Sequence, residues 1–235
     1  MFPNSTNVNC GNPAFADLQA RFVFQPGTCD INNVTQINLS YINQGGIKTD
    51  GVDVSGEFTF DEILSGQVRV GATATYTNKY QVEAQVIQGQ TVAPAFDAAG
   101  LYNYTTGYYA LPKWKGNVYG EYEIGRHNVR LQVNYVDSYL DQRTTPFAGN
   151  LVIGNVATVG AATTIPRPLD GKTVKSYVTA DVNYRATLPG DAMVAVAIGN
   201  ILNQDPPLAR MELNYDGQQA SALGRTFKVT VSKTF

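Results

Sequence analysis

Charged side chains are scarce in this chain. Asp, Glu, Lys and Arg make up 15% of its 235 residues, whereas soluble domains carry about 25%. Long apolar runs are also missing, and no segment approaches the ~18 uninterrupted apolar residues of a transmembrane helix. The formal net charge of −2 argues against a nucleic-acid partner. The chain does contain 14 Tyr and 22 Gly, a composition that suits alternating β-strands better than helices.

Residues able to carry out catalysis are few. The single histidine, His127, falls in a predicted tight turn rather than over a cleft. No Ser, His and Asp arrangement for nucleophilic catalysis is recognisable. His127 also lies far along the sequence from both cysteines, which argues against a metal site. We therefore expect no enzyme activity, no catalytic residue, no metal and no cofactor.

The two cysteines, Cys10 and Cys29, each lie among turn residues ahead of the first clear strand. In an exported protein we expect such a pair to form a disulfide that closes a loop. Two free thiols in a cytosolic protein, or a chance pair, are the alternatives. Closing a loop of about 19 residues should stabilise it by on the order of 3 kcal/mol.

Alternation of apolar and polar residues with a period of two is the dominant pattern, and it predicts strands with one apolar and one polar face. The segments that show it are 51–60, 67–76, 114–124, 128–135, 178–185, 192–198 and 226–235. A transmembrane β-strand needs roughly 9–11 residues, and the segment 226–235 fits that length.

The parity of these strands predicts which residues share a face. The apolar face is expected to hold Val118, Val133, Val182, Val196 and Val229. The polar face is expected to hold Asn117, Asn134, Asn183 and Thr230. Together the strands predict an all-β fold, an antiparallel transmembrane β-barrel with its apolar face toward lipid and its polar face toward the lumen.

The connections between these strands alternate between short and long. The short ones are predicted at 61–66, 125–127 and 187–190, and the long ones near 78–112, 140–175 and 201–223. Outer-membrane barrels have this asymmetry, with short periplasmic turns and long extracellular loops. A soluble sandwich has no physical reason to place every long loop at one end.

Aromatic residues on the apolar parity concentrate near the strand ends, as expected for girdles at the two membrane interfaces. Near the periplasmic ends are Phe60, Tyr122, Tyr184 and Phe235, and near the outer ends are Tyr76, Trp114, Tyr135 and Phe227. Ordinary core aromatics of a soluble sheet are the alternative.

One earlier strand is ambiguous. Ile37 and Leu39 are apolar at odd positions, whereas the apolar positions from Val52 onward are even. A continuous strand changes parity only through an extra residue, and Gly45-Gly46 is a natural bulge site. Either one long bulged strand covers 37–60 or the segment is a short hairpin. We favour the long strand, which extends the segment 51–60 toward the N-terminus and keeps the total at seven.

Five short segments carry a more specific pattern. They are Asn43-Gln44-Gly45-Gly46 leading to Gly51-Val52-Asp53, Pro112-Lys113-Trp114-Lys115, the strand 176–184, Gly199-Asn200-Ile201-Leu202-Asn203 leading to Pro206, and Tyr215-Asp216 leading to Gly224-Arg225. In their order and spacing these segments resemble the late barrel strands of TonB-dependent outer-membrane receptors. The resemblance covers about residues 34–235.

The resemblance implies a domain organisation. Family members have 22 strands and an N-terminal plug, so this chain would hold the last seven strands as an incomplete, open, curved sheet. Residues 1–33 would be an extracellular loop segment and 34–235 the C-terminal portion of the barrel. The first residues lack the basic and apolar segments of a secretory signal, so we expect the chain to be part of a longer exported one.

The final strand has a further role by resemblance. In outer-membrane barrels a terminal aromatic residue is the usual assembly signal, which the barrel-assembly machinery reads. Phe227, Val229, Val231 and Phe235 would supply it here.

The resemblance also implies a function: active uptake of a siderophore, cobalamin or oligosaccharide across the bacterial outer membrane. Membrane lipid, a small-molecule ligand and TonB, reached through the missing plug, would be the partners. A passive porin-like barrel and a soluble β-sandwich binding module are the alternatives. Loop residues Tyr102, Tyr104, Tyr108 and Tyr109 are candidate ligand contacts, unless that loop simply packs on itself.

Overall fold

The computed structural model describes residue 13 and residues 16–29, 33–38, 46–87, 90–102, 109–141, 172–210 and 213–234. They fall into two compact units. The smaller unit spans Met1–Asp50 and Lys79–Ala98, and the larger spans Gly51–Asn78 and Ala99–Phe235. Strands dominate among these described residues, beside one turn of α-helix, α2 (Ala16–Gln19). Within the described residues, no helix has the length and apolar content needed to cross a membrane.

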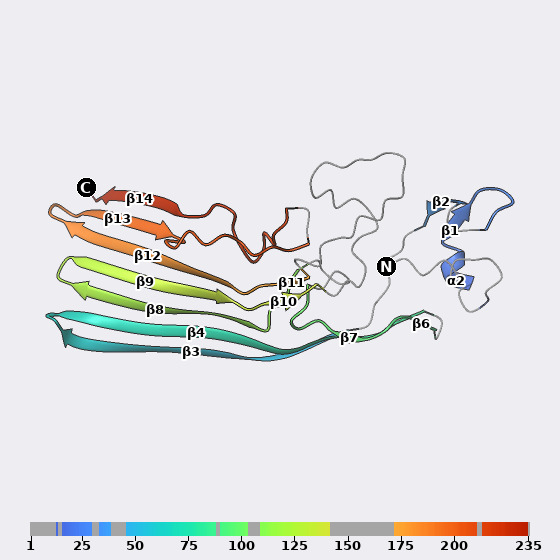
Figure 1. Cartoon of the computed structure of the whole chain (residues 1–235), viewed down its shortest axis with the longest axis horizontal. Coiled ribbons are helices and arrows are strands. Elements are labelled where there is room, and N and C mark those ends of the chain that lie inside the picture. The colour runs from blue at the N-terminus through green and yellow to red at the C-terminus, as the bar shows by residue number, and fades with distance from the viewer. Residues whose placement is uncertain are drawn as a thin grey trace. The chain divides into compact units, whose positions relative to one another are not determined.

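Most of an antiparallel sheet of eight strands lies in the larger unit, whereas its residues 47–50, 79–82 and 96–97 belong to the smaller one (Figure 1). Its strands are β3 (Ile47–Ile63), β4 (Gly66–Val82), β8 (Trp114–Ile124), β9 (His127–Val136), β12 (Tyr177–Leu188), β13 (Ala192–Gly199) and β14 (Thr226–Lys233), with β7 (Phe96–Asp97) beside β4. The order is β14-β13-β12-β9-β8-β4-β3. The sheet does not close, so the predicted all-β, antiparallel, open sheet is confirmed, with β14 and β3 at its edges.

The smaller unit holds two separate hairpins. β1 (Phe22–Phe24) pairs with β2 (Val34–Ile37), and β5 (Gln85–Ile87) pairs with β6 (Gln90–Ala93). The prediction of one long bulged strand over 37–60 is therefore wrong. Ile37 lies opposite Phe22 in the first hairpin. Ile37 and β3 therefore belong to different sheets, and the change from odd to even apolar positions requires no bulge.

Short and long connections lie at opposite ends of the strands, as predicted (Figure 1). The hairpin turns are Leu64-Ser65, Gly125-Arg126 and 189–191. The first is shorter than the predicted 61–66 because β3 continues to Ile63. Leu64 and Ser65 both have positive φ, 49° and 65°, as type I′ turns require, and that turn matches the twist of paired strands. The long connection between β9 and β12 contributes both β10 (Tyr139–Leu140) and β11 (Thr173–Val174), which pair with each other.

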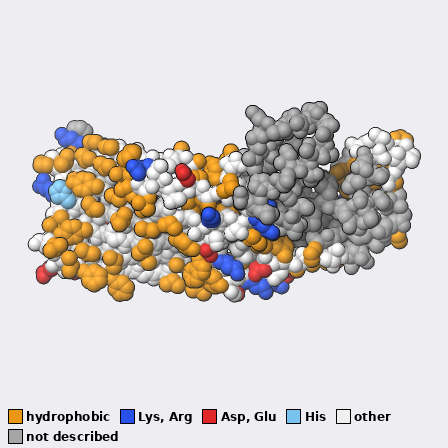
Figure 2. Space-filling model, in the orientation of Figure 1, with side chains coloured by type: hydrophobic (Ala, Val, Ile, Leu, Met, Phe, Trp, Pro, Cys, Tyr) orange, Lys and Arg blue, Asp and Glu red, His pale blue; other side chains and the backbone are white. Residues whose placement is uncertain are grey.

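The two faces of the sheet differ sharply in polarity. Val118 lies opposite Ala72 on one side and Val133 on the other, whereas Asn117 lies opposite Thr73 and Asn134. The predicted segregation of these residues onto two faces is therefore confirmed. The apolar side chains are strongly exposed, with Val118 at 53% and Phe58 at 70%. Figure 2 shows hydrophobic side chains spread along the sheet.

The turn between β3 and β4 can be improved. Leu64 is 84% exposed and holds a conformation that Asn and Gly adopt at lower cost. Replacing Leu64-Ser65 by Asn-Gly should stabilise the protein by about 1 kcal/mol, measured by denaturant unfolding. Gly190, with φ of 74°, is the matched control, because Gly190→Ala should destabilise the protein by a similar amount. A destabilised Asn-Gly variant would show that the Leu64 side chain packs against something.

Candidate functional site

A row of oppositely charged side chains crosses the polar face of the sheet, and we call this row the charge ladder. Arg69 of β4 contacts Glu57 of β3 at 3.5 Å and Glu121 of β8 at 3.1 Å, and Arg130 of β9 reaches the second oxygen of Glu121 at 3.6 Å. Glu121 is directly opposite Arg69 in one ladder and opposite Arg130 in the other. Opposite charges in such positions stabilise a given register, so this ladder favours the observed alignment of β4, β8 and β9.

Hydrogen bonds extend the charge ladder to the next strand. Arg130 Nη2 donates to Gln132 Oε1 at 3.1 Å, Gln132 Nε2 to Asn134 Oδ1 at 2.7 Å, and Asn134 Nδ2 to Asp181 Oδ2 at 2.7 Å. The guanidinium of Arg130 also lies 3.7 Å from the centre of the Tyr119 ring, a cation–π contact. Because most side chains of the ladder have partners, this face is polar yet internally ordered.

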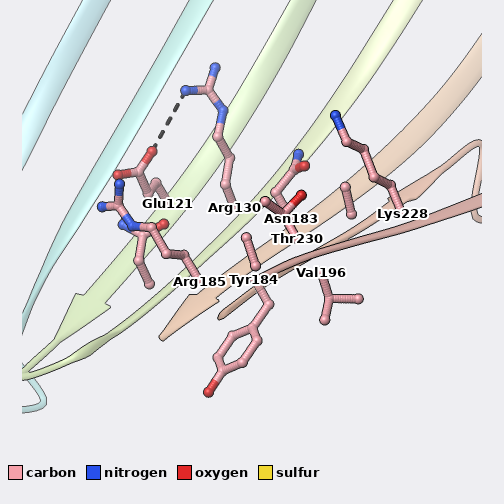
Figure 3. A pocket seen from close by; sticks show the side chains of 11 residues that line it. Glu121, Arg130, Asn183, Tyr184, Arg185, Val196, Lys228 and Thr230 are labelled. Atoms are coloured by element: carbon pink, nitrogen blue, oxygen red, sulfur yellow. Dashed lines mark hydrogen bonds and ion pairs between the residues drawn. The ribbon is translucent and has the colours of Figure 1, made fainter. Parts of the chain in front are cut away.

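A hollow on the polar face opens beside this network and extends from β8 to β14 (Figure 3). Its volume is about 340 Å³. Its polar-face lining is Glu121, Asn128, Arg130, Asn183, Arg185, Ala195, Ala197, Lys228 and Thr230. Tyr184 and Val196 also border it, but their side chains point to the opposite side of the sheet (Figure 3).

Small side chains create the hollow. Ala195 of β13 lies between Arg185 and Thr230, and Ala197 lies between Asn183 and Lys228. The sequence shows β13 as an apolar strand but does not reveal that Ala195 and Ala197 each lie beside one cation, because cross-strand register decides which residues meet. We therefore did not predict Arg130, Arg185 or Lys228 as site residues.

The long connections form a compact cluster with its own core. Its buried apolar residues are Tyr102, Ala110, Tyr139, Val174 and Ala209. The Tyr139 hydroxyl donates to Asp216 Oδ2 at 2.8 Å. Arg210 Nε contacts Asp141 Oδ2 at 2.9 Å, with side chains only 10% and 3% exposed. These contacts tie together loops that are far apart in sequence.

The predicted loop tyrosines have different surroundings. Tyr102 is 4% exposed and its ring lies 6.5 Å from that of Tyr139, a position that agrees with the alternative of a loop packing on itself. Tyr109 is 49% exposed and stays a candidate ligand contact. Tyr104 and Tyr108 lie outside the described residues.

The predicted girdle residues lie near the strand ends, where several hydroxyls find partners. At the turn end, the Tyr122 hydroxyl donates to the Leu64 carbonyl at 2.9 Å and that of Tyr184 lies 2.7 Å from His127 Nδ1. At the loop end, the Tyr135 hydroxyl donates to Asp137. Tyr76 and Trp114 pair there with ring centres 4.5 Å apart.

The remaining predicted residues lie on exposed strands or outside the described residues. Phe60 is 49% exposed on β3, and Phe227, Val229 and Val231 of β14 are 67–70% exposed. Phe235 lies outside the described residues. Cys29 is a disulfide cysteine, but Cys10 lies outside the described part, so the Cys10–Cys29 pairing stays a prediction.

Neither the protein-family models nor the curated proteins include a match to this chain. The resemblance to TonB-dependent receptors therefore stays a prediction. Within the described ranges, no group of three or more His, Cys, Asp and Glu side chains is placed to hold a metal ion.

The buried Asp141–Arg210 pair should be important for the loop cluster. Arg210→Met removes the cation and leaves a carboxylate that is 3% exposed, so we expect a loss of roughly 3 kcal/mol and faster proteolysis of the long connections. Limited proteolysis with mass mapping measures it. The double variant Asp141→Leu/Arg210→Met should recover part of the loss, because the buried carboxylate that Arg210 neutralises is then removed as well. Equal loss in both variants would contradict the ion-pair explanation.

Proposed function

We propose that this chain forms part of the wall of a bacterial outer-membrane β-barrel, as the C-terminal portion of a TonB-dependent uptake receptor. The observation that carries the proposal is the contrast between the two faces of the sheet. The apolar face is strongly exposed on β3, β8, β9 and β14, whereas the polar face holds a network of ion pairs and hydrogen bonds. A barrel in lipid needs this arrangement, with apolar side chains outward and polar side chains toward water.

The apolar face is difficult to reconcile with a soluble β-sandwich. A sandwich covers one face of each sheet with a second sheet about 10 Å away, and exposed apolar patches beyond a few hundred Å² usually mark an interaction surface. Among the described strands, no second sheet covers Val118, Val129 or Leu131, which are 43–53% exposed. Lipid is the occupant that fits a continuous apolar face on every strand.

The strand ends favour a membrane orientation as well. Tight turns lie at one end and the loop cluster at the other, and tyrosines with bonded hydroxyls lie near both ends. A tyrosine with an apolar ring and a partnered hydroxyl suits the boundary between lipid and water. Short periplasmic turns and long extracellular loops follow from this orientation.

Active uptake rests on the family resemblance, and a passive porin-like barrel remains the second candidate. The resemblance favours the receptor because the motifs at 43–53, 199–206 and 215–225 occur in the family's order. A plug-coding segment upstream in the gene would support the receptor, and a gene that encodes only barrel strands would support the porin. A small-molecule ligand would then meet the loop cluster and the polar face.

Arginine substitution on neighbouring residues tests the membrane assignment. Val118→Arg places a charge on the apolar face and should cost roughly 2–4 kcal/mol if that face meets lipid near the midplane. Asn117→Arg, one residue away on the polar face, should cost only about 1 kcal/mol through the lost hydrogen bond to Thr73. Unfolding of the protein in lipid vesicles measures both losses. Equal losses would contradict the assignment of faces.

Labelling gives an independent test. Single cysteines at Val133, Val182 and Val229 should react with a lipid-soluble probe in membranes, whereas cysteines at Asn134, Asn183 and Thr230 should react with a water-soluble one. The background carries Cys10→Ser and Cys29→Ser. Equal labelling of both sets by the lipid-soluble probe would rule out a membrane-facing sheet.

A further inference from the structure

The hollow on the polar face carries unbalanced positive charge. Its lining includes Arg130, Arg185 and Lys228 but one carboxylate, Glu121. Glu121 is already engaged by Arg69 and Arg130. Within the part of the chain that the structure describes, neither Arg185 nor Lys228 forms an ion pair. Two cationic side chains therefore border one hollow without a neutralising partner.

The strand register places these two cations on opposite walls. Arg185 belongs to β12 and Lys228 to β14, with the alanines of β13 between them. Neighbouring strands are about 4.8 Å apart, so the two backbones are separated by roughly 10 Å and the two long side chains flank a shallow floor. The two cations are offset by two residues along the strands, because Arg185 is level with Thr230 and Lys228 is level with Asn183. An amide and a hydroxyl therefore lie across from the two cations. Figure 3 shows these side chains rising from the same side of the sheet.

The chemistry of this lining selects the class of ligand. A guanidinium donates in a planar fork and an ammonium is a compact point charge, and both bind phosphate oxygens. A volume of about 340 Å³ exceeds the need of a single carboxylate. Glu121 is on β8 and Asn128 on β9, at the end of the hollow away from β14, so repulsion by Glu121 directs an anion toward the β13–β14 side.

We propose that this hollow binds a multiply charged, phosphate-bearing anion from the aqueous side of the sheet. Arg185 and Lys228 supply the charge, Asn183 and Thr230 supply hydrogen bonds, and Ala195 and Ala197 supply the space. The inference rests on one part of the proposed function, namely that the polar face of the sheet borders a water-filled lumen.

Inorganic pyrophosphate is the probe. We expect the 235-residue chain in detergent micelles to bind it in isothermal titration calorimetry, and Arg185→Gln/Lys228→Gln to weaken binding by at least about tenfold. Arg126→Gln/Lys172→Gln removes the same charge from residues outside the hollow and should leave binding within about twofold. Equal weakening by both double variants would overturn the site in favour of a general effect of net charge.

Two further variants test whether binding needs the shape of the hollow or only its positive charge, and whether a loss of binding comes from misfolding. Ala197→Leu keeps both cations but fills the floor, and we expect it to abolish binding. Arg185→Lys/Lys228→Arg keeps both charges and should bind within about threefold of the parent chain. Unchanged binding by Ala197→Leu would overturn the proposal. Far-ultraviolet circular dichroism confirms that each variant keeps its strand content.

A lipid headgroup carries the same phosphate chemistry as a soluble anion. A vesicle-binding experiment distinguishes these two sources of phosphate. Vesicles of zwitterionic lipid with and without anionic phospholipid should bind the parent chain and Arg185→Gln/Lys228→Gln alike, because the hollow lies on the face opposite to the apolar one. A binding difference confined to anionic vesicles would contradict a water-side site. Pyrophosphate binding in micelles together with failed lipid labelling would leave this inference standing and overturn only the membrane assignment.

Discussion

Antiparallel register is the constraint on which the rest of the structure depends. Because side chains alternate between faces, a slip of one residue would exchange the faces of a strand completely. In the observed register Val118 lies with Val133 and Ala72, and Glu121 lies with Arg69 and Arg130. A one-residue slip of β8 would carry Glu121 to the apolar face and separate it from both arginines. The charge ladder and the apolar face therefore stabilise the same alignment.

The two ends of the sheet are held by different interactions. At the turn end, backbone pairing continues to the last residues of the strands. Tight turns with positive φ at Leu64, Ser65 and Gly125 close the hairpins there. At the loop end, packing replaces pairing: the aromatic rings of Tyr102 and Tyr139 are buried, and the pair Asp141–Arg210 joins two loops. A loop cluster with its own core can present residues such as Tyr109 in a defined position, which bare loops of the same length could not do.

Local pattern was sufficient to predict much of the sheet. Strand periodicity located β4, β8, β9, β12, β13 and β14, and the faces of Val118 and Asn117 followed from parity. The hairpin of β1 and β2 was not predicted, because Phe22–Phe24 is too short for its alternation to stand out. Parity alone also could not show that Ile37 pairs with Phe22, since that pairing spans 15 residues and depends on tertiary contacts.

Features that depend on cross-strand neighbours were not predictable. Arg69 and Glu121 are 52 residues apart in sequence, and Arg210 and Asp141 are 69 apart. Each pair arises only once the strands or loops are aligned. The hollow is similar: Ala195 and Ala197 look like ordinary strand residues until β12 and β14 place Arg185 and Lys228 beside them. Sequence reasoning found the strands and the faces, whereas the chemistry of the polar face required the register.

The edges of the sheet constrain what can complete it. Each strand in the order from β3 to β14 runs antiparallel to its neighbour, so these two edge strands run in the same direction. They could pair with each other only as a parallel ladder, whereas antiparallel closure needs an odd number of further strands between them. The polar face is acidic on β3, where Asp53 and Glu57 lie, and basic at Lys228 on β14. In lipid each unpaired backbone group costs several kcal/mol. An antiparallel barrel that contains this sheet must therefore draw the strands beside both edges from elsewhere, and the strand next to β3 would be best matched by cationic residues on its polar face.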